Sequence, residues 1–310
     1  MSDYVILTDS SNDLTKDLRE RFGIDDYFPG ILEFPDGHQE LSTLDWDDMS
    51  PAEFYGSMNK KNTYKTAVRG LGEQEAFFEK YLSQGYDILN LSLSSALSGT
   101  YSVCVSAAKN LQEKYPDRKI IVIDTLRYSG GAGLIASYAG EMKKAGKTID
   151  EVAAWVEENK HRVHQMGTVD DLFFLKNMGR VSNMAAVMGS LINIKPLADF
   201  NEVGMNQVMG KAKGYKNMYK AVIEYMKKTI ENPSEQRLFI SCTNRKAQAM
   251  QLKEMVEKEF APAEIISTTV CKANGAAIGP GMVDVFYLGT PITKNLEEET
   301  KILQEILNNL

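Results

Sequence analysis

Apolar positions in the first half of the chain follow two alternating periods. Short continuous runs rich in β-branched residues predict buried strands, and apolar residues repeating every three or four positions predict amphipathic helices. The predicted strands are 4–8, 86–93 and 119–124. The predicted helices are about 14–22, 77–85, 98–114 and a segment after the glycines at 130, 131 and 133, with two more beginning at capping boxes, 50–53 and 148–151. This order predicts a three-layer α/β domain with a mostly parallel sheet covered on both faces.

The second half predicts a different arrangement of elements. A strand at 191–200 ends at a hairpin-like turn, 201–204, which leads to a strand at 205–209. The further predicted elements are helices at about 215–230, 245–259 and 296–307 and strands at 237–242, 264–270 and 283–288. We therefore expect a second α/β domain and place the boundary near residue 163, which gives domains of 1–163 and 164–310. No linker rich in Pro, Gly or Ser marks the boundary, so the two domains should be packed together.

Composition narrows the classes of function. The 310 residues carry 35 Lys and Arg against 42 Asp and Glu, a net charge of −7, so no general basic excess favours a nucleic-acid partner. No apolar run approaches the length of a membrane span, about 18 residues, and the N-terminus lacks the basic region of a signal peptide. Three cysteines without a CxxC pair predict neither a disulfide framework nor a zinc site, which favours a reducing cytoplasm.

Hydroxyl-bearing and acidic residues follow the predicted parallel strands, at the sheet edge where ligands of such folds bind. The segments in question are 9–11, 94–95 and 125–129. The run 94–100 (SSALSGT) places several hydroxyls between a strand and a helix. These hydroxyls can cap the helix. Together with free backbone amides they can equally form an anion site for a carboxylate or a phosphate.

Catalytic and nucleotide-binding motifs are weak or missing. The glycines of 129–133 lack the GxGxxG spacing and suit close packing of a helix on a sheet. Asp9 suggests either an aspartyl nucleophile or a polar turn before a helix. The chain lacks GxSxG, places none of its three histidines near the serines, and has no acidic cluster for magnesium. These features favour a binding protein without catalytic apparatus, cofactor or metal. A stand-alone hydrolase or small-molecule kinase, and a regulator that binds another anionic ligand, are the alternatives.

The basic segments and the methionine cluster of the second half each have a structural and a functional interpretation. The basic residues of 176–180, 195 and 211–213 fit a solvated surface or a docking patch for an acidic or phosphate-bearing partner. Met178, Met184 and Met188 suit a core, and they can also line an adaptable apolar cavity.

Several segments, in the right order, resemble those of one known family. They are TDSSNDL at 8–14, LSSALSGTY at 93–101, VID at 122–124 with Ser129 and Gly130, DL at 171–172 with LKNMGRVS at 175–182, IKP at 194–196 with Gly204, and GPG at 279–281. The chain is similar to the DegV family, bacterial fatty-acid-binding proteins that serve as carrier subunits of fatty acid kinase. The resemblance covers nearly the whole chain.

This resemblance implies a mechanism of binding and presentation. A long-chain fatty acid would lie between the two domains, with its carboxylate held by hydroxyls and its acyl chain in an apolar tunnel. A separate kinase would then phosphorylate the carboxylate to an acyl phosphate. The resemblance assigns the carboxylate contacts to Thr66 and Ser98, with Ser95 and Ser94 alongside.

Two departures from the family pattern concern the head group. Ala67 stands where a hydroxyl is usual, and Ala277 stands where a histidine often precedes GPG. We expect Arg69, three residues after Thr66, to pair with the carboxylate instead. Otherwise the head group differs or the protein does not serve a kinase. Arg180 and Lys213 fall where basic residues of the family face the kinase partner.

Overall fold

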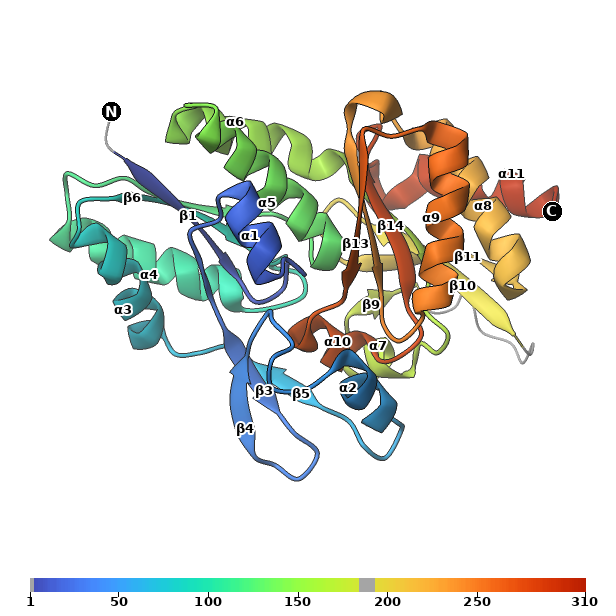
Figure 1. Cartoon of the computed structure of the whole chain (residues 1–310), viewed down its shortest axis with the longest axis horizontal. Coiled ribbons are helices and arrows are strands. Elements are labelled where there is room, and N and C mark those ends of the chain that lie inside the picture. The colour runs from blue at the N-terminus through green and yellow to red at the C-terminus, as the bar shows by residue number, and fades with distance from the viewer. Residues whose placement is uncertain (1–2, 184–192) are drawn as a thin grey trace.

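The computed structural model describes residues 3–183 and 193–310, and these form three sheets (Figure 1). The first sheet is parallel throughout, in the order β2-β1-β6-β7. Its strands are β1 (Tyr4–Asp9), β2 (Asp26–Phe28), β6 (Asp87–Ser92) and β7 (Ile120–Asp124). The three strands predicted for the first half are therefore confirmed, and β2 was missed because it spans three residues with one buried side chain.

Helices cover both faces of this sheet, which confirms the three-layer prediction (Figure 1). The helices of this half are α1 (Lys16–Phe22), α2 (Pro51–Ser57), α3 (Leu71–Leu82), α4 (Thr100–Lys114), α5 (Ser129–Lys144) and α6 (Ile149–Asn159). Side chains of β1 alternate between the layers: Val5 and Leu7 belong to the core under α3 and α4, whereas Ile6 belongs to the main core on the side of α5. Both predicted capping boxes form, at Ser50–Glu53 and Thr148–Glu151.

Helix α5 corrects one prediction, because it begins at Ser129 and contains the glycines that were expected to precede it. The glycines let two other parts of the protein come close to the backbone of α5. A Cβ on Gly130 would lie 2.6 Å from the Phe286 ring, and one on Gly133 would lie 2.5 Å from the Asn12 carbonyl oxygen. Close packing of a helix is thus what these glycines provide.

The large sheet is mixed and has the order β13-β12-β14-β8-β10-β11-β9 within the described residues. Its strands are β8 (Val163–Thr168), β9 (Val181–Ser182), β10 (Ile194–Phe200), β11 (Asn206–Lys213), β12 (Arg237–Cys242), β13 (Glu264–Thr269) and β14 (Val283–Leu288). The helices after β8 are α7 (Phe173–Asn177), α8 (Gly214–Thr229), α9 (Lys246–Phe260), α10 (Lys272–Ile278) and α11 (Glu297–Asn308). Helices α8, α9 and α11 pack against the large sheet, and α5 packs against β12 and β14.

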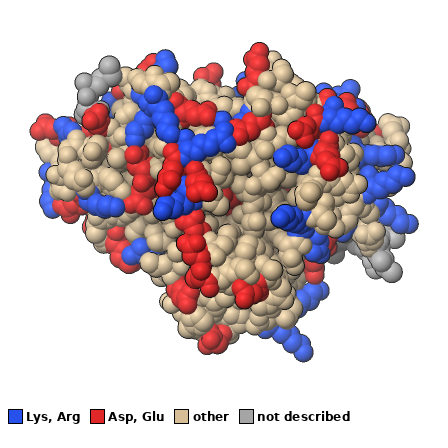
Figure 2. All heavy atoms as spheres, viewed as in Figure 1, with Lys and Arg blue, Asp and Glu red and all other residues tan. Residues whose placement is uncertain are grey.

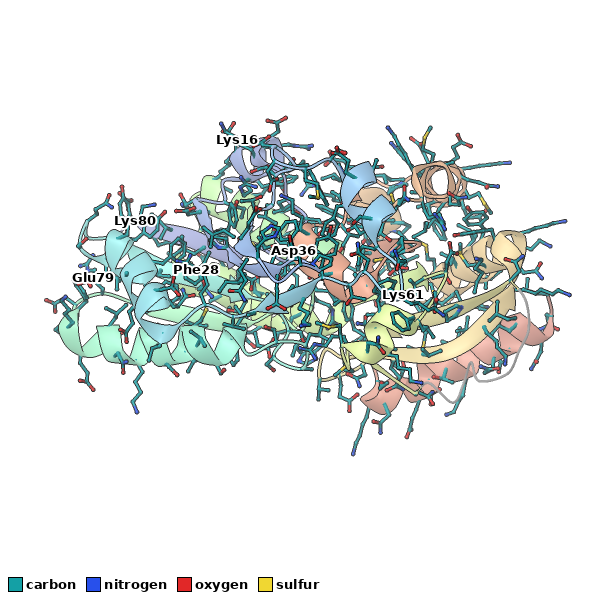
Figure 3. The ribbon with its side chains drawn as sticks, turned by 90° about the horizontal axis from the view of Figure 1, so that it is seen from below. Lys16, Phe28, Asp36, Lys61, Glu79 and Lys80 are labelled. Atoms are coloured by element: carbon teal, nitrogen blue, oxygen red, sulfur yellow. The ribbon has the colours of Figure 1, made fainter. Side chains whose placement is uncertain are left out.

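A small antiparallel sheet, β4-β3-β5, lies below and between the two larger ones (Figures 1 and 3). Its strands are β3 (Gly30–Glu33), β4 (Gln39–Ser42) and β5 (Lys65–Ala67), and the turn that holds Asp36 joins β3 to β4. Leu32 of β3 is buried against Phe54, Tyr55 and Phe174. The sequence patterns did not predict this sheet, because each strand has only three or four residues and one buried side chain or none.

Each half of the chain contributes one helix that packs on a sheet of the other half. All strands before Val163 lie in the first and the small sheet, and all described strands from Val163 onward lie in the large one. Helix α5 nevertheless packs on the large sheet, and α10 packs on β3 and β5. The hydrophobic core is accordingly continuous from β1 to α11. None of the helices in the described part of the chain combines the length and the apolar character that crossing a membrane requires.

Candidate functional site

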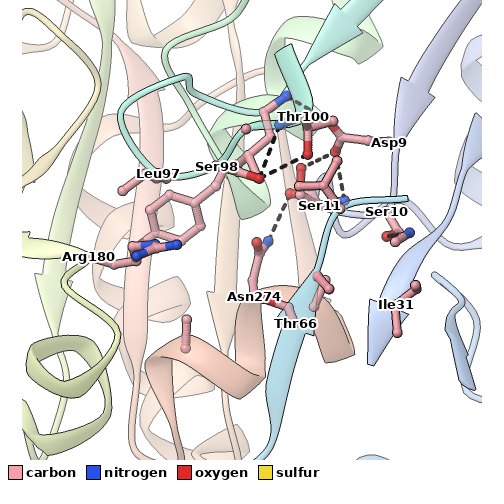
Figure 4. A pocket seen from close by; sticks show the side chains of 18 of the residues that line it. Asp9, Ser10, Ser11, Ile31, Thr66, Leu97, Ser98, Thr100, Arg180 and Asn274 are labelled. Carbon is pink, nitrogen blue, oxygen red and sulfur yellow. Dashed lines mark hydrogen bonds between the residues drawn. The ribbon is translucent and has the colours of Figure 1, made fainter. Parts of the chain in front are cut away.

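A cavity of about 170 Å³ opens where the carboxyl ends of β1 and β6 face the small sheet and α10 (Figure 4). Its walls come from the turn after β1, the segment before α4, strand β5, α10 and the segment around α7. The edge of the parallel sheet that the sequence selected is therefore one wall of the cavity. The other walls come from elements far away in the sequence.

The turn after β1 supplies a buried carboxyl group. One Asp9 carboxylate oxygen accepts hydrogen bonds from the Ser11 amide, at 3.1 Å, and from the Ser11 hydroxyl, and the other accepts from the Leu93 amide at 2.7 Å. Burial raises the pKa of Asp9, although these hydrogen bonds act in the opposite direction. Asn12 closes the turn by donating to Thr8 and to the Asp9 carbonyl. The polar turn is thus the observed structure of this segment.

The start of α4 presents hydroxyls and backbone amides to the cavity. Ser98, Gly99 and Thr100 all line it. The Ser98 hydroxyl lies 2.9 Å from the Thr100 hydroxyl and accepts a hydrogen bond from the Thr100 amide at 3.3 Å. Helix α4 directs the positive end of its dipole here, so the arrangement favours an anionic or acceptor group in the cavity.

Strand β5 and the segment after it carry Thr66 and Arg69 to the same cavity. Thr66 pairs with Leu32 across the small sheet, which fixes its position at the rim. The Arg69 guanidinium lies 4.4 Å from the centre of the Phe28 ring and donates from Nε and Nη2 to one oxygen of Glu73, at 2.9 and 2.6 Å. Arg69 thus lines the cavity while its charge is paired with a neighbouring carboxylate.

Helix α10 supplies the opposite wall with Ala273, Asn274, Ala277 and Ile278. The Asn274 side chain donates to the Ser11 carbonyl at 2.8 Å, so it ties this helix to the turn after β1 (Figure 4). Ala277 follows Asn274 by three residues and also lines the cavity. The position that the family resemblance links to a histidine therefore does face the cavity.

Apolar side chains complete the wall and lead towards a second, smaller space. Phe28, Ile31, Leu97, Leu175 and Met178 line the first cavity. A space of about 30 Å³ lies behind it, between α7 and the large sheet. The residues that line both spaces are Tyr128, Leu175, Asn206 and Ile278. The cavity therefore has hydroxyls and amides in one part and an apolar continuation in another.

The predicted ligand-binding residues divide into two groups. Thr66, Ser98 and Arg69 come together at the cavity. Ser94 and Ser95 do not line it. The buried Ser94 hydroxyl donates to the Gly204 carbonyl at 2.9 Å, and the exposed Ser95 donates from its amide to Asp124. Ser94 thus holds the β10–β11 turn against the first sheet, and Ser95 anchors its own loop.

The two residues expected to face a partner differ in their surroundings. Arg180 lines the cavity, on the side of Leu97 and Ser98 in Figure 4, and its guanidinium donates to the Met178 carbonyl. Lys213 is exposed at the start of α8. Lysines of α8 contribute to the basic edge of the molecule near this helix, whereas charges of both signs mix over much of the visible face (Figure 2).

Several cavity residues were not foreseen as ligand contacts. Asp9, Ser10 and Ser11 were placed at the correct sheet edge but were given no binding role. Tyr128 belongs to the selected segment 125–129 but was also given no binding role. Gln74 and Asn274 carried no sequence signal, because only the fold brings α3 and α10 to one cavity. Of the three methionines, Met178 lines the cavity, whereas Met184 and Met188 lie outside the described residues. Over 3–183 and 193–310, no group of three His, Cys, Asp or Glu side chains could hold a metal ion.

Comparison with known proteins gives consistent matches over the full fold. Residues 3–290 match the model of the DegV family, described as an uncharacterised protein family. A DegV domain-containing protein of Clostridium perfringens is 38% identical over 290 residues, which is 93% of this chain and 98% of that protein. A crystal structure of a DegV lipid-binding protein from Thermotoga maritima has a TM-score of 0.80 at 26% identity and covers 94% of this chain and 100% of its own. A second protein of that organism, described as revealing fatty-acid-binding function, has a TM-score of 0.79 at 26% identity and covers 92% of this chain and 99% of its own.

Proposed function

Because the chain belongs to the DegV family, we propose that it binds one long-chain fatty acid in the cavity between the first sheet, the small sheet and α10. The observation that carries this proposal is the division of the cavity wall. Hydroxyls and amides gather at Thr66, Ser98 and Thr100, and apolar side chains lead inward past Leu175 and Ile278. A carboxylate needs donors and an acyl chain needs an apolar wall, so this arrangement suits both ends of a fatty acid.

The acyl chain would extend from the first cavity into the smaller space behind it. Leu175 and Ile278 border both spaces, and Val169, Leu172 and Met282 line the inner one. Small movements of the bordering side chains would join the two spaces into one tunnel. Burial of each methylene in such a tunnel contributes about 0.8 kcal/mol, so the chain would provide most of the affinity and the head group the orientation.

We propose further that the protein presents the bound carboxylate to a separate kinase and carries out no chemistry itself. Asp9 is the acidic residue in the cavity wall, and its oxygens accept hydrogen bonds from Ser11 and Leu93. An aspartate engaged in this way is a structural part of its turn. Acyl-phosphate formation would take place in the cytoplasm, where the three buried free thiols would stay reduced.

Two measurements test this function. Native mass spectrometry of the protein purified from bacterial cells should show a bound mass of roughly 250–300 Da, the size of a C16–C18 acid. Titration of the delipidated protein with palmitate should then give one site per chain. A copurifying phosphate ester, or no saturable palmitate binding, would contradict the proposal. The kinase step is tested separately by adding ATP and a fatty acid kinase catalytic subunit to the loaded protein and measuring acyl phosphate.

A further inference from the structure

Gln74 is a polar side chain on the buried face of α3, whose other buried side chains are apolar. Helix α3 buries Gln74, Phe78 and Leu82, which are spaced four residues apart and form one stripe along it. Phe78 and Leu82 join the core under α3 and α4. Gln74, in the first turn, instead reaches the wall of the cavity.

The side-chain amide of Gln74 lacks a partner for its donor. Only 1% of the residue is exposed, and its Nε2 has no hydrogen-bond partner in the described part of the chain. Nearly all buried polar groups in folded proteins have such a partner, so an unpaired amide donor in a cavity wall indicates that the occupant supplies the acceptor. Glu73, the acidic neighbour, instead accepts hydrogen bonds from Arg69 and from the Gly70 amide.

The groups around this cavity narrow the chemistry of the acceptor. Thr66 and Ser98 bring hydroxyls to the same cavity, and the start of α4 brings the positive end of a helix dipole. A group with two acceptor oxygens and a negative charge satisfies several such donors at once, as a carboxylate does.

We propose that Gln74 is a head-group residue, which donates from Nε2 to a carboxylate oxygen of the bound acid. This inference rests on the proposed function. Gln74 supplies a donor that does not titrate, and the alanine at position 277 leaves room for the head group on the opposite wall.

The test compares Gln74→Met with wild type and with Gln84→Met. Methionine keeps the length of the side chain and removes the donor. Gln84 is an exposed glutamine just after the same helix, and its Nε2 donates to the Lys80 carbonyl. Its replacement therefore controls for loss of a glutamine amide away from the cavity. Two quantities are measured on delipidated protein: the melting temperature without ligand, and the palmitate affinity by calorimetric titration.

The proposal predicts opposite changes in the two quantities. Gln74→Met should weaken palmitate binding at least about tenfold, the effect of one hydrogen bond to a charged group. The same variant should melt at a higher temperature without ligand, because it no longer buries an unpaired donor. Gln84→Met should leave palmitate affinity unchanged and should not raise the melting temperature, because it removes a hydrogen bond that the protein itself satisfies.

Unchanged palmitate affinity in Gln74→Met would overturn the proposal, whatever the melting temperature does. A loss of affinity together with a lower melting temperature would also overturn it, because the amide would then be held by the protein itself. If wild type binds no palmitate, the proposed function fails independently, and the melting temperatures still report whether the donor is unpaired.

Discussion

Ala277→His should tighten fatty-acid binding and make it depend on pH. Position 277 faces the cavity from α10, one turn after Asn274, and α10 packs against the strand that carries Thr66. A histidine there would add one donor close to the expected head group. Wild type has no titrating nitrogen at this position, so the change is a gain that can be measured against an unaltered background.

The size of the gain depends on the charge of the imidazole. A neutral histidine adds an ordinary hydrogen bond of about 0.5–1.5 kcal/mol, and a protonated one adds about 1.5–3 kcal/mol. Bound carboxylate raises the pKa of the histidine above its usual value of about 6.5, so the complex binds a proton more tightly than the free protein. Affinity should therefore be highest near pH 6 and fall as the pH rises. If the ligand raises the pKa of this histidine by about 1, the total fall is about tenfold.

The assay is a palmitate titration at pH 6, 7 and 8, with each variant compared with wild type at the same pH. This ratio cancels any titration of Asp9, which is present in every variant. Ala277→Asn is the matched control, because it adds a donor that does not titrate. If Ala277→His and Ala277→Asn give the same ratio at all three pH values, position 277 does not face the head group and the placement of the carboxylate is wrong.

Three further predictions concern other side chains. Thr66→Ala combined with Ser98→Ala should lower palmitate affinity at least about tenfold while the fold stays intact, and calorimetry showing unchanged affinity would rule out their role. Arg180→Glu should weaken palmitate binding, because Arg180 lines the cavity and a glutamate there would repel the carboxylate. Lys213→Glu should leave lipid binding unchanged and should weaken a kinase complex in a salt-dependent way. A pull-down at two salt concentrations checks this second effect. Burial raises the pKa of Asp13 to about 6, so the native state keeps a proton that the unfolded state loses near pH 4, and stability falls as the pH rises between these values. Urea unfolding from pH 4 to 7 should show Asp13→Asn gaining about 2 kcal/mol relative to wild type, and a constant difference would contradict the raised pKa.

The sequence predicted the elements whose burial pattern is unambiguous. The apolar runs of β1, β6 and β7 and the 237–242 and 283–288 strands all proved to be strands. Strand β8 was missed, although all six of its residues are buried, because His164, Gln165 and Thr168 interrupt its apolar pattern. Buried polar side chains of this kind depend on tertiary partners, such as Asp199 for His164, which no local pattern reveals.

The site was predictable only up to the sheet edge. The rule for parallel sheets selected the segments after β1, β6 and β7. Residues 9–11 and Tyr128 line the cavity, whereas Ser94 and Ser95 after β6 do not. The direction of each side chain was beyond such a rule. Ser94 turns toward Gly204 and away from the cavity, and Arg180 turns back onto Met178 after the positive φ of Gly179. Both directions are set by contacts between segments that the chain brings together only when folded.

The exchange of α5 and α10 between the two halves has a consequence for synthesis on the ribosome. Helix α5 ends at Lys144, yet β12 and β14, which cover one of its faces, begin only at Arg237 and Val283. The small sheet is likewise translated before α10, which covers Leu32 and its neighbours in the folded protein. The nascent chain therefore exposes apolar surface until translation is nearly complete, which makes chaperone contact during synthesis advantageous. The cavity is consequently among the last features of the molecule to form.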